Sequence, residues 1–206
     1  SVPPYNEDLE TTPFMDELAK KSLLAERAYG SVPYTSKSSV AVNCGIFPHP
    51  VQLSYGLAPE ASPGGIPAKC FPDLLKDQGY GTAYFTTSEK SFEDFGDLVN
   101  NFGYEELYSY ESMDKQDYSR LRGEGLSGDE AMLESSEEWL TEQKELGNPF
   151  LAAYLTAVTH YPYLVPDSYE QEKLAEDEDL NRYLNAIRLQ DMFLESLFDQ
   201  YKDLGL

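Results

Sequence analysis

Apolar residues recur at helical spacing in three long segments, which predicts three amphipathic helices. The first is expected to begin at Thr12, where a cap residue precedes Pro13, and to run to about Glu26. The second is expected after Ser127, which would form a capping box with Glu130. The last helix carries the longest apolar stripe, which is expected to pack in the core: Leu180, Tyr183, Leu184, Ile187, Leu194, Leu197, Phe198 and Tyr201.

Two shorter helices are predicted in the first half of the chain. Residues 36–43 precede Gly45, and residues 71–78 precede Gly79, which are both suitable helix-ending glycines. Residues 50–68 are rich in proline and glycine and are therefore expected to form a loop.

Two apolar segments predict strands. Residues 82–86 follow a glycine, and residues 150–158 form an apolar segment that is expected to be buried on both faces of a parallel sheet. Residues 104–126 are expected to be irregular. Because helices and strands alternate, the pattern predicts an α/β fold, a three-layer α/β/α sandwich. The strands expected before the first helix and after the last are missing, which indicates a fragment of a larger domain.

The strongly acidic composition limits the classes of function. The formal net charge is −22, which argues against binding to nucleic acids or anionic membrane surfaces. A protein this negative that handles an anionic ester must supply local positive charge, most directly with a metal ion. No apolar segment is long enough to span a membrane. Cys44 and Cys70 match no zinc spacing, so they form either a disulfide or two buried thiols.

The densest cluster of chemical groups lies in residues 31–39. Six hydroxyl groups surround Lys37 just before a predicted short helix, whose N-terminus favours anions. A hydroxyl at this position can attack a bound ester when a metal or a base lowers its pKa. Alternatively, the segment is a serine-rich turn that only caps the helix.

His160 is the second candidate, because it follows the predicted strand at 150–158. Ligands of open α/β sheets bind at the carboxyl ends of the strands. Alternatively, His160 is an ordinary loop histidine. His49 lies in a proline-flanked turn and is expected to be structural, and Asp191 is expected to be the partner of a buried polar group.

Taken in order, several segments resemble the sulfatase family of the alkaline-phosphatase-like superfamily. Each motif is short, but their order along nearly the whole chain makes the resemblance specific. The segments are TPFMDELA at 12–19, AY at 28–29, GYGTA at 79–83, FGY at 102–104, HYPY at 160–163 and YLNAI at 183–187.

The family pattern implies which residue is the nucleophile. Sulfatases carry Cys or Ser at the start of a short helix, followed by Pro two residues later and Arg four residues later, with a glycine ten residues after the Cys or Ser. Gly45 lies ten residues after Thr35, whereas an alanine lies ten residues after Ser31. The resemblance therefore implies Thr35 as the nucleophile, with Lys37 and Ser39 in place of the family's Pro and Arg.

Threonine cannot be oxidised to the formylglycine of sulfatases, so the chain is closer to the phosphoglycerol transferases, such as lipoteichoic acid synthase, and to the phosphoethanolamine transferases. In these relatives a metal-bound threonine attacks a phosphodiester. The resemblance implies that Thr35 is both the nucleophile and a ligand of a divalent Mn, Mg, Ca or Zn ion. It also implies that His160 binds the substrate. Lys37, which the family pattern does not supply, is expected to bind the substrate by offsetting the charge of its oxygens together with the helix N-terminus.

The resemblance also carries expectations about the whole protein. Residues 1–206 are expected to be the central fragment of a sulfatase-like catalytic domain, without the first and last metal-binding strands, and thus to hold little or no metal alone. The expected substrates are small-molecule, lipid or glycan phosphate or sulfate esters. The relatives work outside the cytoplasm, usually on a membrane anchor, and this location favours a disulfide between Cys44 and Cys70.

Two other functions stay open. One is sulfate-ester hydrolysis on the same fold. The other is a catalytically inactive sulfatase-like module that binds a glycan or an envelope complex, which the absence of the family's Arg favours.

Overall fold

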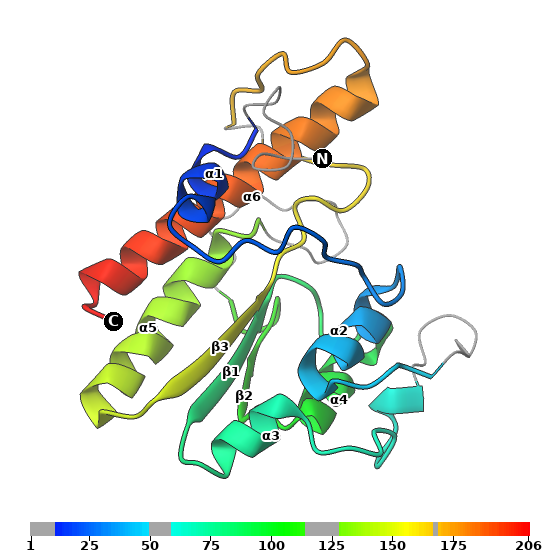
Figure 1. The fold of residues 1–206 in the computed structure, drawn as a ribbon, viewed down its shortest axis with the longest axis vertical. Coiled ribbons are helices and arrows are strands. Elements are labelled where there is room, and N and C mark those ends of the chain that lie inside the picture. Colours follow the sequence, from blue (N-terminus) through cyan, green and yellow to red (C-terminus); the bar gives the residue numbers. More distant parts are fainter. Residues whose placement is uncertain (1–10, 50–58, 114–127, 167–168) are drawn as a thin grey trace.

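The computed structural model describes residues 11–49, 59–113, 128–166 and 169–206 (Figure 1). Helices and strands alternate along these residues. The helices are α1 (Pro13–Ala19), α2 (Thr35–Cys44), α3 (Phe71–Lys76), α4 (Phe95–Phe102), α5 (Ala131–Leu146) and α6 (Glu178–Asp203), with short 3-10 turns at Pro59–Ala61 and Phe92–Asp94. The strands are β1 (Gly81–Thr86), β2 (Glu106–Tyr108) and β3 (Phe150–Leu155).

The three strands form a parallel sheet in the order β2-β1-β3. The central strand β1 pairs along its whole length with β3, from Gly81 opposite Phe150 to Thr86 opposite Leu155. Parallel neighbours need long crossovers, and helices α4 and α5 lie in these connections. The carboxyl ends of the strands therefore meet at one edge of the sheet.

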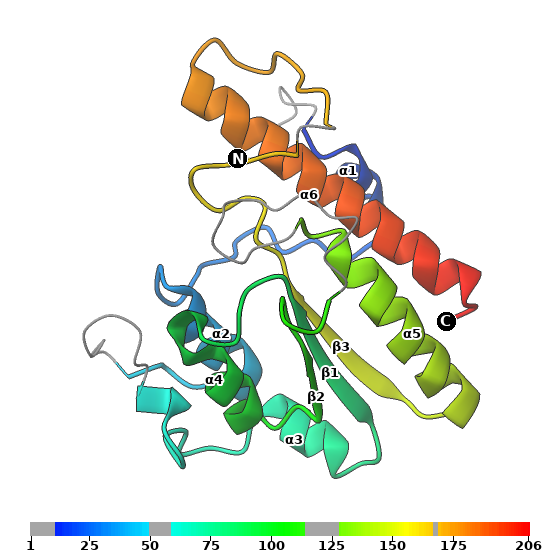
Figure 2. The same cartoon turned by 180° about the vertical axis from the view of Figure 1, so that it is seen from behind.

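Side chains that alternate along β1 supply the two faces of the sheet with separate cores. Tyr84 packs with Val40 of α2 and with apolar residues of α4. Phe85 points to the other face, where Trp139 of α5 and Phe193 of α6 pack against it. Figures 1 and 2 show the result: α2, α3 and α4 lie on one side of the sheet and α1, α5 and α6 on the other. The predicted three-layer α/β/α architecture is confirmed.

The predicted strand at 82–86 and the helices at 36–43, 71–78 and the C-terminus are confirmed within a few residues of β1, α2, α3 and α6. The glycines expected to end helices do so, because Gly45 and Gly79 adopt the left-handed conformation with φ of 65° and 83°. The capping box expected at Ser127 lies outside the described residues. Of the predicted loop at 50–68, residues 50–58 also lie outside the described residues, while residues 59–68 contain the short 3-10 turn Pro59–Ala61 and no longer helix or strand.

Three predictions about elements are wrong. The first helix ends at Ala19 instead of about Glu26, because the next apolar side chain, Leu23, is fully exposed and has no core to pack against. The segment 104–126 contains the short strand β2. Strand β3 ends at Leu155 and is only half-buried, since it is an edge strand within the described sheet.

Asp191 has the role that its position in the apolar stripe predicts. Its side chain is buried in α6 and accepts hydrogen bonds from the main-chain N–H groups of Phe14 and Met15, both at 2.9 Å. These are unpaired donors of the first turn of α1. A carboxylate from α6 therefore caps α1 and holds it on the outer layer.

Within the described residues, every helix is too short or too polar to cross a lipid bilayer.

Candidate active site

Thr35 is the first residue of α2, whose N-terminal end lies on the side of the sheet where the strands end. The preceding Tyr34 is extended and contributes no side-chain cap, while its carbonyl accepts from Ser38 N–H at 2.8 Å and begins the helix. The Ser38 hydroxyl also donates to the Val32 carbonyl at 2.6 Å, which fixes the chain that leads to the helix. Thr35 is partly exposed, so a group from solvent can reach this helix start.

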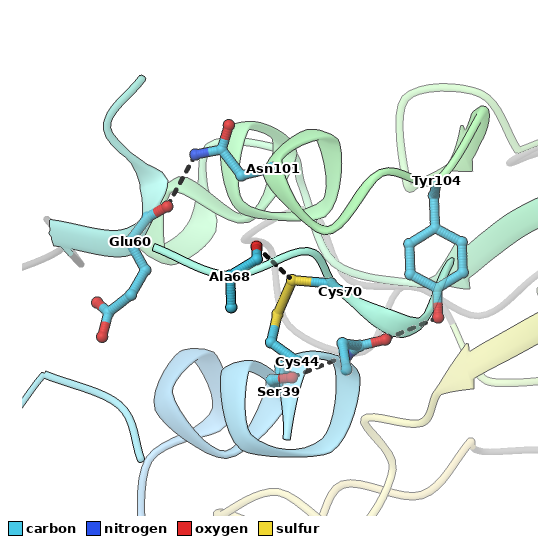
Figure 3. Close-up of a disulfide and its surroundings, with 8 residues drawn as sticks. Ser39, Cys44, Glu60, Ala68, Cys70, Asn101 and Tyr104 are labelled. Atoms are coloured by element: carbon cyan, nitrogen blue, oxygen red, sulfur yellow. Dashed lines mark hydrogen bonds between the residues drawn. A yellow bond between two sulfur atoms is a disulfide. The ribbon is translucent and has the colours of Figure 1, made fainter. Parts of the chain in front are cut away.

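The other end of α2 is anchored to the layer that it shares with α3 and α4. Cys44, the last residue of the helix, forms a disulfide with Cys70, the residue that precedes α3 (Figure 3). The preceding residue, Asn43, accepts a hydrogen bond from the Tyr104 hydroxyl at 2.8 Å. The disulfide expected from the resemblance is thus present, and it fixes the helix that begins at Thr35.

A carboxylate reaches the N-terminus of α2 from another segment. Glu93 accepts a hydrogen bond from Ser36 N–H at 3.1 Å, so an acidic side chain caps the helix. Glu93 and Asp94 both have left-handed backbones, with φ of 50° and 53°, which is strained for residues with a side chain. The Glu93 carboxylate therefore occupies the N–H group of the residue that follows Thr35, where an anionic substrate would otherwise bind.

Lys37 does not point into solvent. Its ammonium group forms a buried ion pair with Glu60, with 2.6 Å between Nζ and Oε2. Burial alone would raise the pKa of Glu60, but the hydrogen bonds from Lys37 and from the main-chain N–H of His49 hold it below its ordinary value. The positive charge of Lys37 thus already has a carboxylate partner. His49 contributes its main chain to this pair, in agreement with its expected structural role.

His160 lies in the turn that follows β3, with its ring exposed to solvent. Its main-chain N–H donates to the Ala157 carbonyl at 2.9 Å. Its Nδ1 lies 2.8 Å from the Tyr161 carbonyl, and since a carbonyl only accepts, Nδ1 carries the proton. The Nε2 atom therefore remains as the acceptor of the neutral ring or the second donor of the charged ring.

The segments that carry Thr35 and His160 lie on the same side of the parallel sheet. Figures 1 and 2 agree that the N-terminal end of α2 lies on the same side of the sheet as the carboxyl ends of β1 and β3. In open α/β sheets this is the edge where ligands bind. In the described part of the chain no hydrogen bond joins Thr35 to His160, and the catalytic and binding roles of these residues stay predictions.

The sequence reasoning missed Asp129, which lies at the same edge just before α5. Its carboxylate is buried and accepts from Ala157 N–H at 2.7 Å, from Val158 N–H at 3.1 Å and from the Thr87 hydroxyl at 3.4 Å. Burial raises the pKa of Asp129 to about 6, although these hydrogen bonds counteract the shift. No local sequence signal marks this residue, because its partners lie on two other segments.

The described residues do not make a complete metal site. Among residues 11–49, 59–113, 128–166 and 169–206, no three His, Cys, Asp or Glu side chains are grouped so that they could hold a metal ion. The Thr35 hydroxyl alone cannot replace such a set of ligands.

A parallel sheet between two helical layers defines an α/β protein of the three-layer sandwich class. The lipoteichoic acid synthase LtaP from Listeria monocytogenes superposes with a TM-score of 0.82 at 22% identity, over 95% of this chain and 47% of that chain. A protein in the alkaline phosphatase superfamily from Vibrio parahaemolyticus gives a TM-score of 0.72 at 22% identity, over 94% of this chain and 45% of that chain. These likenesses establish the fold.

The chain belongs to the Sulfatase family, which it matches over residues 4–206. It is similar to the lipoteichoic acid synthase-like protein YvgJ from Bacillus subtilis (strain 168), with 27% identity over 207 residues. This match covers 96% of the chain but 31% of YvgJ. The chain thus spans about a third of its curated relative and about half of the similar solved chains. The expected family is confirmed, on the lipoteichoic acid synthase side.

Proposed function

We propose that the protein to which this chain belongs transfers or hydrolyses phosphate esters, with Thr35 as the nucleophile. The single observation that carries the proposal is the partly exposed threonine at the first position of α2, on the side of the sheet where the strands end. Support also comes from the Sulfatase family match and from the names of its relatives, a lipoteichoic acid synthase and a similar protein. Phosphoglycerol-type lipid or glycan esters are the proposed substrates, in line with the phosphoglycerol transferases that the sequence resembles.

In the proposed reaction, Oγ1 of Thr35 forms a bond to phosphorus while the bond from phosphorus to the leaving oxygen breaks. The hydroxyl proton passes to solvent, and the leaving oxygen takes a proton from Nε2 of a charged His160 or from water. An acceptor hydroxyl or water then attacks the phosphothreonine and releases Thr35. The N-terminus of α2 would stabilise the charged phosphate oxygens.

The proposal includes a divalent metal ion that Thr35 binds together with ligands outside the described residues. Such an ion would lower the pKa of the hydroxyl and offset the charge of the phosphate. Lys37 is proposed to add to the positive potential at the helix start, although its ammonium group is paired with Glu60. The proposed location is outside the cytoplasm, with a membrane anchor elsewhere in the protein; the disulfide between Cys44 and Cys70 agrees with an oxidising compartment.

A catalytically inactive binding module is the second candidate, and one observation favours it. The carboxylate of Glu93 occupies Ser36 N–H, the group that an anionic substrate would meet beside Thr35. In an inactive relative this cap would be permanent. In an enzyme the Glu93 carboxylate would have to move away from Ser36 N–H, or leave other N–H groups of the helix start for the substrate.

Turnover by the full-length protein tests the proposal. With Mn²⁺ and the chromogenic phosphodiester bis(4-nitrophenyl) phosphate, Thr35→Ala should lower kcat by at least about 10³-fold, because nucleophile removal abolishes the covalent route. Ser31→Ala is the matched control, since Ser31 is an exposed hydroxyl of the same segment, and it should keep wild-type kcat.

Four outcomes would contradict the assignment. Wild-type turnover in Thr35→Ala would remove Thr35 from the reaction, and loss in Ser31→Ala alone would move the nucleophile. Turnover of 4-nitrophenyl sulfate in preference to the phosphodiester would favour sulfate-ester hydrolysis. No turnover of either compound by the wild type, with a normal fold, would favour the binding module.

A further inference from the structure

Asp129 is a buried carboxylate to which the proposed reaction assigns no role. It is 3% exposed and lies just before α5, far in sequence from the segments that it touches. Its Oδ1 accepts from Ala157 N–H at 2.7 Å and its Oδ2 accepts from Val158 N–H at 3.1 Å. Both donors lie immediately after β3, where the chain leaves the sheet.

These hydrogen bonds continue directly to His160. The carbonyl of Ala157, whose N–H is held by Asp129, accepts the main-chain N–H of His160 at 2.9 Å. The turn at 157–160 is therefore held by the Asp129 carboxylate at its first residue and closed by the main-chain hydrogen bond from His160 to Ala157. A shift of Ala157 would move the His160 backbone with it.

Two further contacts hold the same turn against the sheet. The Thr87 hydroxyl, just after β1, donates to Asp129 at 3.4 Å. Gln190 of α6 donates to the Thr156 hydroxyl at 2.7 Å, at the end of β3. The carboxyl ends of the two paired strands are thus joined through Asp129, which makes this residue the connection between the sheet and the histidine turn.

From this geometry we infer that Asp129 is a positioning residue that sets the place of the His160 ring at the carboxyl edge of the sheet. The inference rests on the proposed function, because it assigns Asp129 a role through His160. The carboxylate form is required, since two main-chain N–H groups and a hydroxyl need acceptors. An asparagine there offers one acceptor oxygen and turns an NH₂ donor toward another donor.

A double-mutant cycle on the full-length protein tests the inference, with bis(4-nitrophenyl) phosphate and Mn²⁺ as the assay. Asp129→Asn should lower kcat roughly ten- to a hundredfold with little change in KM, the usual cost of losing a group that orients a functional histidine. In the His160→Ala background the same substitution should cost less than about twofold more, because the ring that it orients is already gone. Glu130→Gln is the neighbouring control and should stay within about twofold of wild type.

The cycle separates the possible failures. A similar loss from Asp129→Asn in both backgrounds would show a general structural role and overturn the inference, while the role of His160 would stand. Wild-type kcat in His160→Ala would remove His160 from the proposed function, and the inference would fall with it.

A second variant tests the inference if the melting temperature shows that Asp129→Asn does not fold. Thr87→Val keeps the shape of the side chain and removes only the hydroxyl donor to Asp129. It should lower kcat by about threefold, since this hydrogen bond is long at 3.4 Å, and only when His160 is present. An unchanged kcat for Thr87→Val, or a loss that persists in His160→Ala, would also contradict the inference.

Discussion

Lys37 and Glu60 illustrate how burial decides the role of a single residue. The side chains are 6% and 3% exposed, and their charged atoms lie 2.6 Å apart. A buried charge is tolerated when it is paired and hydrogen-bonded, and Glu60 also accepts the His49 N–H. The lysine expected to bind substrate is thus also part of the support for α2.

Lys37→Met should lower the free energy of unfolding by about 3–5 kcal/mol, because it leaves the Glu60 charge buried without a partner. Adding Glu60→Gln should restore most of this loss, since the amide keeps an acceptor for His49 N–H and removes the charge. Urea unfolding of the two variants measures the difference. Lys20→Met, which removes two exposed ion pairs, is the control and should leave the midpoint unchanged. Equal losses in the single and double variants would contradict this account.

At the scale of elements, α2 is the part of the fold on which the proposed site depends. Its N-terminus carries Thr35, while its C-terminus is bonded through Cys44 to Cys70 at the start of α3. The sequence separation of the two cysteines is 26 residues, so the crosslink restricts a sizeable loop of the unfolded chain.

The variant Cys44→Ala/Cys70→Ala should therefore lower the free energy of unfolding by about 3 kcal/mol. Amide hydrogen exchange should also become faster in α2, since this helix loses its covalent anchor. A reducing agent should produce the same change in the wild-type protein and none in the double variant. Equal exchange in α2 of both proteins would show that Tyr104 and the core hold the helix without the disulfide.

The accuracy of the predicted elements follows the kind of signal that each one has. Helix α6 and strand β1 have strong periodic or continuous apolar patterns, which are local properties of the chain. Helix α4 was not predicted, although its buried residues have helical spacing: Phe95, Leu98, Val99 and Phe102. Strand β2 is only three residues long and is defined by its pairing with β1, so no pattern within it identifies it.

At the scale of the whole molecule, the net charge of −22 acts on stability rather than on the architecture. Crowded carboxylates repel one another, and salt screens this repulsion because the Debye length falls to about 3 Å at 1 M. The melting temperature should therefore rise as NaCl increases from 0.02 to 0.5 M, by about 2–4 °C for each 1 kcal/mol of relieved repulsion. Calorimetry in NaCl and in KCl should give the same rise. A fall in the melting temperature would mean that attractive ion pairs outweigh the repulsion.

The sequence alone was sufficient for the α/β class, the family and the position of Thr35 at a helix start. These properties depend on local patterns and on the order of short motifs along one chain. Periodicity and capping are set by residues within a few positions of one another, so they can be read without coordinates.

Only the tertiary structure decided which charged groups meet. Glu60 lies 23 residues from Lys37, Asp129 lies 28 residues from Ala157, and Glu93 lies 57 residues from Ser36. Each pair is brought together by the packing of helices and loops around the parallel sheet, whose strands are joined by long crossovers. Contacts between residues so far apart in sequence depend on the fold, so the local sequence around either residue does not predict them.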